Sequence, residues 1–157
     1  MTVPRLKTSG VAGDSRMTPQ WLVDELAVRY AGGVFSLDVC ASAVSAKAKR
    51  YFDVQANGLV QPWICSSFFC NPPWSAIEPW VQKGIETVHT LRHASVGVYV
   101  LPARLSSAWW QVLTSHAEVL KPIRGRVQFP PEDPSVKSSS NPEATIYAVL
   151  RRDIERP

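Results

Sequence analysis

The segment Ser67-Phe68-Phe69-Cys70-Asn71-Pro72-Pro73-Trp74 predicts a buried strand that ends abruptly in a rigid bend. The apolar run before the asparagine is typical of a strand, and two consecutive prolines cannot continue its ladder because proline has no N–H to donate. Each residue that precedes a proline is also restricted to extended conformations. The sequence therefore predicts a stiff backbone at the end of a buried strand.

Helical and strand patterns alternate on both sides of this bend. Threonine suits an N-cap and proline the first helical position, so Thr18-Pro19 predicts a helix start, and Gly32-Gly33 predicts its end. Ser75 and Glu78 fit a capping box for a helix that should run to about His93. Further helical segments are expected at residues 45–49 and 105–115, and strands at residues 34–40, 51–54, 67–70, 96–101, 119–123 and 144–150.

This alternation predicts an α/β domain with a mostly parallel sheet and helices on both faces. The closing strands are joined by turns and by a proline-rich loop over residues 130–142, so we expect them to be antiparallel on one edge. Ligands of such sheets bind beyond the carboxyl ends of the strands. Asp38, Cys40 and the pair Cys70-Asn71 fall at those ends, which predicts that they share one crevice.

The composition indicates one globular domain. The chain has 157 residues, of which 45% are hydrophobic and 19% charged, enough for one core and too few for two ordinary domains. We expect a flexible lead-in over residues 1–16 and a single domain over residues 17–157. No apolar run is long enough to span a membrane and the first residues lack the apolar core of a signal peptide, which favours a cytoplasmic protein.

Charge and cysteine usage narrow the class of partner. The formal net charge of +4 suits a polyanion such as nucleic acid, although this is a weak indication by itself. The three cysteines lack C-x-x-C spacing and are odd in number, which favours reduced thiols over a disulfide framework or a zinc site. His89 and His93 have the spacing of helical metal ligands, but no carboxylate or cysteine completes a set, so we expect a solvent-facing pair.

The bend carries the groups needed to hold an amino-bearing nucleobase. The side-chain oxygen of Asn71 and the carbonyl of Pro72 are two acceptors, and an exocyclic amino group could donate one hydrogen to each. Trp74 offers a face on which a flipped-out base could stack. The alternative interpretation is that the motif is only a turn with a half-buried aromatic ring.

Asp38 lies close to the carboxyl end of the first expected strand and precedes the small-residue turn Cys40-Ala41-Ser42-Ala43. Many α/β folds hold a nucleoside cofactor at such a place, although a carboxylate that caps the next element is an equally good interpretation. Dinucleotide and triphosphate binding lose their usual support, because neither G-x-G-x-x-G nor G-x-x-x-x-G-K is present.

In their order along the chain, these motifs resemble the phage-type DNA N6-adenine methyltransferase family, over roughly residues 16 to 150. The matching segments are Thr18-Pro19-Gln20, Leu37-Asp38-Val39-Cys40-Ala41-Ser42, Asn57-Gly58-Leu59, Phe69-Cys70-Asn71-Pro72-Pro73-Trp74-Ser75, Trp80-Val81, Leu101-Pro102-Ala103-Arg104 and Gly125-Arg126-Val127-Gln128-Phe129.

The resemblance implies a Rossmann-like class I methyltransferase domain without a separate target-recognition domain, with S-adenosylmethionine as the methyl donor. It also implies double-stranded DNA as the acceptor and a phage or prophage protein that acts in the cytoplasm of a bacterial host. The implied donor-binding residues are Thr18, Pro19, Gln20, Trp21, Asp38, Cys40, Ala41, Ser42, Asn57 and Asn71, with Asn57 the weakest of them.

The implied reaction is direct in-line attack of the adenine amino nitrogen on the methyl carbon. Asn71, Pro72, Pro73 and Trp74 form the implied catalytic set. Acceptors on that nitrogen would stabilise the transition state as the nitrogen becomes tetrahedral, and positioning would provide much of the remaining acceleration. The mechanism needs neither a metal nor a general base.

The chain departs from the family pattern at three positions. Trp74 stands where tyrosine is usual, Asn57 where aspartate is common, and Ser45 where asparagine is common. None of these changes affects the two expected acceptors for the amino group.

DNA contacts are expected from Arg104, Arg124 and Arg126, each of which has the alternative interpretation of an ordinary solvated arginine. The other acceptors that such a bend could serve are RNA adenine, cytosine N4 and a protein glutamine amide, and a catalytically silent donor- or DNA-binding module is a further alternative. The short chain predicts recognition through loops such as residues 130–142 or through a second subunit, and therefore low sequence specificity.

Overall fold

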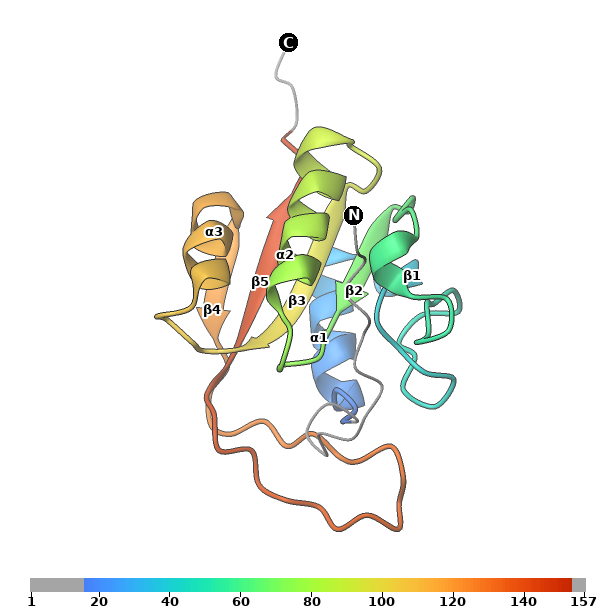
Figure 1. The fold of residues 1–157 in the computed structure, drawn as a ribbon, viewed down its shortest axis with the longest axis vertical. Coiled ribbons are helices and arrows are strands. Elements are labelled where there is room, and N and C mark those ends of the chain that lie inside the picture. The colour runs from blue at the N-terminus through green and yellow to red at the C-terminus, as the bar shows by residue number, and fades with distance from the viewer. Residues whose placement is uncertain (1–15, 154–157) are drawn as a thin grey trace.

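The structure is a computed structural model that describes residues 16–153. All but the last residue of the expected lead-in over residues 1–16 therefore lies outside the described residues. The helices are α1 (Gln20–Tyr30), η1 (Gly58–Val60), α2 (Glu78–Ile85), η2 (Glu86–Thr90) and α3 (Ala108–His116). The strands are β1 (Leu37–Asp38), β2 (Ser67–Cys70), β3 (Val96–Pro102), β4 (Val119–Pro122) and β5 (Thr145–Arg151) (Figure 1). Within residues 16–153, no helix is long and apolar enough to cross a bilayer.

The five strands form one sheet in the order β1-β2-β3-β5-β4. β1, β2 and β3 are parallel to one another, whereas β5 is antiparallel to both of its neighbours, β3 and β4. The β3–β5 ladder extends from the pair Val96 and Arg151 to the pair Pro102 and Thr145. The prediction of a parallel α/β sheet with antiparallel closing strands is confirmed.

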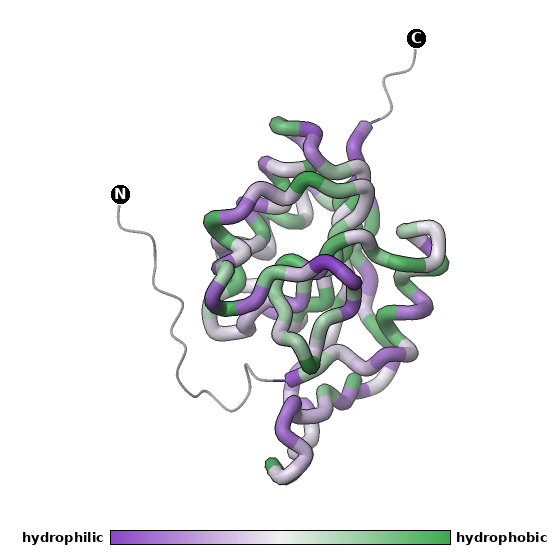
Figure 2. Tube along the Cα trace, turned by 90° about the vertical axis from the view of Figure 1, so that its right-hand side faces the viewer, coloured by the Kyte–Doolittle hydropathy of each residue, from purple (hydrophilic) through white to green (hydrophobic). Residues whose placement is uncertain are grey.

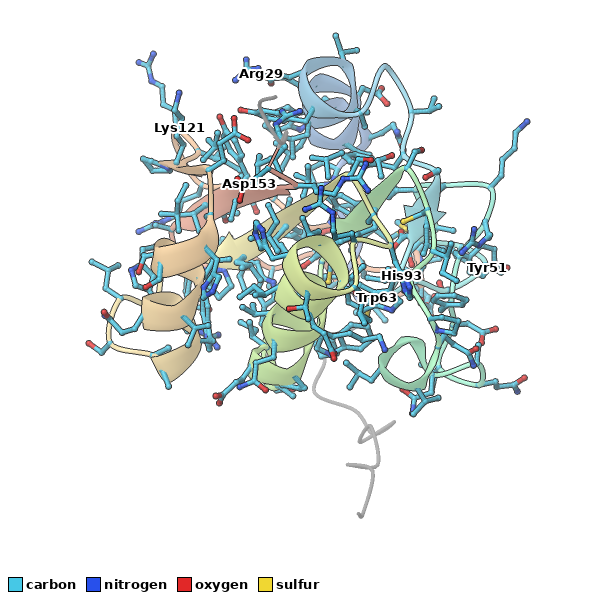
Figure 3. The ribbon with its side chains drawn as sticks, turned by 90° about the horizontal axis from the view of Figure 1, so that it is seen from above. Arg29, Tyr51, Trp63, His93, Lys121 and Asp153 are labelled. Atoms are coloured by element: carbon cyan, nitrogen blue, oxygen red, sulfur yellow. The ribbon has the colours of Figure 1, made fainter. Side chains whose placement is uncertain are left out.

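Helices cover both faces of the sheet: α1 lies on one face, and α2 and α3 lie on the other (Figure 3). The continuous apolar run of β3 supplies both cores, because successive side chains of a strand point to opposite faces. Val98 and Val100 join the cluster under α1, and Tyr99 and Leu101 join the cluster under α2 and α3. Each such buried side chain contributes about 1.5–3 kcal/mol.

A close approach of α2 to the sheet depends on Gly84. A Cβ atom added at Gly84 would overlap the hydroxyl of Tyr99, and that hydroxyl donates a 2.8 Å hydrogen bond to the carbonyl of Trp80. Since Tyr99 is fully buried, it has no room to move away. Only glycine lets this helix lie so close to β3, and the helix starts directly after the bend.

Three predicted elements differ from the structure before the bend. The strand expected at residues 51–54 is reduced to a single bridge between Tyr51 and Asp38, because Asp53 starts a turn by accepting from the backbone N–H of Ala56. The helical piece expected at residues 45–49 does not form: residues 43–45 are a turn, closed by reciprocal side-chain hydrogen bonds of Ser42 and Ser45, and residues 47–50 are a bend. The first strand is limited to Leu37–Asp38.

The predicted capping box after the bend is also wrong. α2 begins at Glu78 with Ile77 at its N-cap and no side-chain cap, and the helix continues as the π-helical turn η2. α1 likewise begins one residue later than expected, with Pro19 at its N-cap, so the side chain of Thr18 does not cap the helix. Gly32 and Gly33 end α1 with positive φ angles, as predicted.

Candidate active site

Asn71 lies immediately beyond the carboxyl end of β2, and both ends of its carboxamide are held by hydrogen bonds. Its oxygen accepts from the indole N–H of Trp74 over 2.9 Å, and its nitrogen donates to the hydroxyl of Thr18 over 2.9 Å. An indole N–H can only donate, so the oxygen of the carboxamide must face Trp74. A carboxamide oxygen accepts two hydrogen bonds, and the contact with Trp74 uses one of them.

Trp74 is fixed by three other segments of the chain. Its ring contacts Phe129 edge to face, with 5.1 Å between ring centroids. Its carbonyl accepts a hydrogen bond from Arg104, whose guanidinium also forms a two-pronged ion pair with Glu143 at 2.7 and 2.8 Å. The guanidinium expected to contact DNA at position 104 thus supports the bend from within the protein. Trp74 as a whole is half-buried.

Asp38 is 2% exposed and organises the turn that follows β1. One carboxylate oxygen accepts from the backbone N–H of Cys40 over 3.2 Å, and the other accepts from the N–H of Lys47 over 3.0 Å. Burial raises the pKa of Asp38 to about 7, and the two N–H groups partly oppose this effect. The carboxylate therefore fixes the loop over residues 39–47 from inside.

One contact places this loop beside the start of α1, and another places the bend there. The ammonium group of Lys47 donates to the side-chain oxygen of Gln20 over 3.3 Å, and Thr18, two residues before Gln20, receives the hydrogen bond from Asn71. Hydrogen bonds thus connect four segments: the start of α1, the end of β1, the loop over residues 39–47 and the bend.

The remaining predicted residues differ in their surroundings. Trp21 is 56% exposed at the start of α1. Asn57 adopts the left-handed conformation at a φ of 55° and uses its side-chain oxygen to cap η1 at Leu59. Arg124 and Arg126 are exposed in the turn after β4. Pro19 at the N-cap of α1 is half-buried. The residues assigned to the bend and to the small-residue turn are half-buried except for Pro72, which is buried; they are Cys40, Ala41, Ser42, Asn71, Pro72, Pro73 and Trp74.

The histidine prediction is only partly right. His93 is exposed, but His89 is half-buried and its ring lies 6.0 Å from that of His116 on α3. Among residues 16–153, no group of three side chains suited to metal ligation is present.

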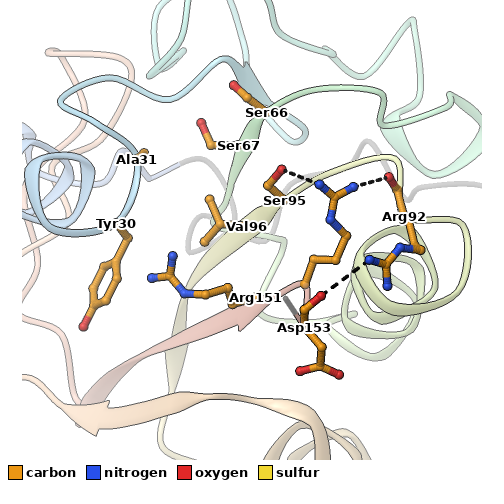
Figure 4. A pocket seen from close by; sticks show the side chains of 10 residues that line it. Tyr30, Ala31, Ser66, Ser67, Arg92, Ser95, Val96, Arg151 and Asp153 are labelled. Carbon is orange, nitrogen blue, oxygen red and sulfur yellow. Dashed lines mark hydrogen bonds between the residues drawn. The ribbon is translucent and has the colours of Figure 1, made fainter. Parts of the chain in front are cut away.

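A cavity of about 540 Å³ lies at the opposite end of the parallel strands from Asn71 (Figure 4). It is lined by the amino ends of β2 and β3 and by three arginines. Arg151 pairs with Glu118 at 2.7 Å, and Arg152 and Arg92 donate to backbone carbonyls. None of the cavity's lining residues belongs to the bend or to the loop over residues 39–47.

Sequence reasoning did not assign Lys47, Phe129 or Glu143 to the site as separate residues. Phe129 occurs within a segment that carried the family resemblance, and Lys47 lies two positions after Ser45, where the chain departs from the family pattern. Glu143 had no such signal, because its contact with Arg104 spans 39 positions of the sequence.

A sheet of this order, with helices on both faces and polar groups gathered beyond the carboxyl ends of its parallel strands, is the Rossmann-like fold of class I methyltransferases. The fold is similar to the crystal structure of a candidate RNA methyltransferase from Pyrococcus horikoshii, with a TM-score of 0.61, 12% identity, and coverage of 94% of this chain and 91% of that one. The family follows from the sequence. The family model for DNA N-6-adenine-methyltransferase (Dam) matches residues 6–157, and the chain belongs to that family.

A curated relative comes from Haemophilus phage HP1 (strain HP1c1) and is named DNA N-6-adenine-methyltransferase. It is 28% identical over 113 residues, which cover 71% of this chain and 64% of the relative. The match thus spans slightly less than two thirds of the relative's length. The resemblance stated from the sequence is confirmed at the level of family and fold.

Proposed function

We propose that this chain transfers a methyl group from S-adenosylmethionine to the N6 amino group of adenine in DNA, with the adenine flipped out of its helix. The observation that carries the proposal is the fixed carboxamide of Asn71, whose oxygen is oriented by Trp74 at the carboxyl end of β2. Membership of the DNA N-6-adenine-methyltransferase family supports the same reaction.

In this proposal the bend holds the amino group. The oxygen of Asn71 uses its second acceptor position, and the Pro72 carbonyl is the other acceptor, so each takes one N6 hydrogen. Both acceptors favour the nitrogen as it becomes tetrahedral and cationic, which makes them more effective in the transition state than in the ground state. The new bond joins N6 to the methyl carbon as the bond from that carbon to sulfur breaks, and the extra proton on N6 then leaves to water.

The donor supplies an activated methyl group, and the groups around Asp38 fit its chemistry. The methionine end of the donor carries an ammonium group and a carboxylate. The loop over residues 39–47 offers the acid Asp38 and the half-buried base Lys47, whose charges interact. Thr18 and Gln20 add polar groups from the start of α1, and the small side chains of Ala41 and Ser42 would let the donor approach the turn closely.

We also propose that residues 17–157 act as one domain and that loop residues 130–142, with Arg124 and Arg126, contact the DNA. This loop follows β4 and enters β5 beside the carboxyl end of β3. Asn71 lies at the same end of the parallel strands. Recognition by a single loop supports the expectation of low sequence specificity. A strict, long recognition site in a methylation map of the purified protein would contradict that expectation.

The test is transfer of labelled methyl from S-adenosylmethionine to unmethylated duplex DNA, with nucleoside analysis of the product. The proposal expects N6-methyladenine with the wild-type protein, at least a hundredfold less with Asn71→Ala, and an unchanged yield with Arg152→Ala, which alters the distant cavity. Donor binding without transfer to DNA would overturn the DNA assignment and favour RNA, cytosine or protein acceptors. Full activity of Asn71→Ala would overturn the mechanism.

A further inference from the structure

The segment that joins β4 to β5, residues 123–144, is attached to the catalytic bend near both of its ends; we call it the recognition loop. Near its start, the ring of Phe129 packs against the ring of Trp74. At its end, the carboxylate of Glu143 holds Arg104, which in turn donates to the carbonyl of Trp74. Two contacts that are 14 positions apart along the loop therefore converge on one residue of the bend.

Asn141 joins the two ends of this loop to each other. Its side-chain nitrogen donates to the carbonyl of Val127 over 3.1 Å, and its side-chain oxygen accepts from the backbone N–H of Glu143 over 3.0 Å. Met17, next to Thr18, donates its backbone N–H to the carbonyl of Pro130 over 2.8 Å. The anchored base of the loop therefore contacts both sides of the proposed site.

Beyond this base, the recognition loop projects from the body of the protein as a mainly polar segment (Figure 2). Residues 133–140 are all exposed, and they include Lys137 and three consecutive serines. Such a segment gains little from burial in the free protein. A ligand that contacts the projecting part would act on the bend through Phe129 and Glu143.

The exposure of the Arg104–Glu143 pair favours a role in positioning over a role in global stability. Its side chains are 36% and 35% exposed, and pairs in such surroundings contribute little to global stability. The hydrogen bond from Arg104 pulls the pKa of Glu143 below its usual value, so the pair is fully charged near neutral pH. Its specific effect is on orientation. Glu143 binds two nitrogens of the planar guanidinium and thereby sets the direction of the third, which donates to the carbonyl of Trp74.

We propose that Arg104 and Glu143 are positioning residues, and that they couple the recognition loop to the catalytic bend, so that DNA contacts on the loop keep Trp74 in the position that stacks the target adenine. This inference rests on the proposed function. It predicts that loss of the pair slows methyl transfer while donor affinity and protein stability change little.

The test compares Glu143→Gln with Glu118→Gln. The second variant breaks an ion pair that matches Arg104–Glu143 in length, because Glu118 binds Arg151 at the same 2.7 Å. That pair lies at the opposite end of the strands from Asn71. We expect Glu143→Gln to lower the single-turnover rate on DNA ten- to a hundredfold, the range typical of a misplaced reacting group. Glu118→Gln should be as fast as the wild type, and calorimetry should give equal donor affinity for all three proteins.

A charge-swapped variant separates positioning from a simple ion pair. Arg104→Glu combined with Glu143→Arg keeps the opposite charges but leaves the Trp74 carbonyl without its donor. We expect no rescue of the single-turnover rate. Full rescue would show that only the ion pair matters and would overturn the coupling.

Hydrogen exchange gives a readout that does not need catalysis. In the wild type, DNA should protect both residues 131–142 and residues 71–76, and in Glu143→Gln it should protect only the loop. Equal protection of the bend in both proteins would overturn the coupling. A wild type that binds DNA but transfers no methyl group would refute the proposed function instead, and the exchange pattern would still test the coupling.

Discussion

The indole N–H of Trp74 donates to the side-chain oxygen of Asn71, and this 2.9 Å contact sets which end of the carboxamide is the acceptor. The opposite end is occupied by Thr18. A carboxamide with one free end can rotate and present its N–H₂ group, which would repel an amino group of adenine. Here the pair of partners prevents that rotation, so the oxygen is oriented before any base arrives.

Trp74→Phe tests this orientation. The phenyl ring keeps an apolar face for stacking but lacks the N–H, so the carboxamide of Asn71 loses one of its two partners. One hydrogen bond contributes about 1 kcal/mol, so we expect a roughly fivefold to tenfold lower rate of methyl transfer. Single-turnover kinetics measures this rate, and Trp74→Ala, which also removes the face, should be slower still. A phenylalanine variant as fast as the wild type would show that the indole N–H has no such role.

Thr18→Val removes the other partner while keeping the shape of the side chain. The donor of Asn71 would then lie beside a methyl group at a site where residue 18 is only 3% exposed. A buried donor left without an acceptor costs about 1–3 kcal/mol, so urea unfolding should show a loss of that size together with slower methyl transfer. Thr18→Ser keeps the hydroxyl and should recover most of both. If serine and valine behaved alike, the hydroxyl would be irrelevant.

Asp38 predicts a dependence of stability on pH. Its pKa rises from 3.8 in the unfolded chain to about 7 in the folded protein because the carboxyl is buried. Between these values the folded protein keeps a proton that the unfolded chain has released, so stability falls as pH rises and levels off above about pH 7.

The matched variant is Asp38→Asn, which cannot titrate. The free energy of unfolding of the wild type relative to this variant should decrease by up to about 4 kcal/mol between roughly pH 4 and pH 8. Urea unfolding across this range measures the difference. Parallel profiles for the two proteins would mean that Asp38 is ionised throughout.

Arg124 and Arg126 are expected to contact phosphates. Each neutralised phosphate adds about 0.9 to the slope of log affinity against log salt concentration, so Arg124→Ala and Arg126→Ala should each lower the slope by about that amount. Fluorescence anisotropy with duplex DNA at several salt concentrations measures it. Arg152→Ala removes the same charge at the opposite end of the strands and should leave the slope unchanged. An equal effect of all three would indicate only a general influence of net charge.

The parts of the fold that follow from local pattern were predictable from the sequence. The apolar run ending in Pro102 predicted β3, and the glycine pair after Tyr30 predicted the end of α1. Boundaries set by competing hydrogen bonds were not predictable. Thr18 has the right chemistry for an N-cap, but its hydroxyl accepts from Asn71, and this partner lies 53 positions away.

The site was predictable in the same uneven way. The bend was visible in the sequence as Asn71 followed by two prolines, and the ordered set of motifs around it carried the family resemblance. The support behind it was not visible, since an ion pair such as Arg104–Glu143 depends on two segments that only the folded sheet brings together. The strand expected at residues 51–54 failed for a local reason, because the side chain of Asp53 favours a turn over a continued ladder.

The position of β5 leaves the sheet incomplete until late in the synthesis of the chain. β5 lies between β3 and β4 although it is made after both, and β4 pairs with no other named strand among residues 16–153. Until Thr145–Arg151 has left the ribosome, β3 exposes a long apolar edge that can pair with other chains. Glu143, immediately before β5, reaches Arg104 only when that gap is filled. A chain that stops before Thr145 therefore lacks this support for the bend.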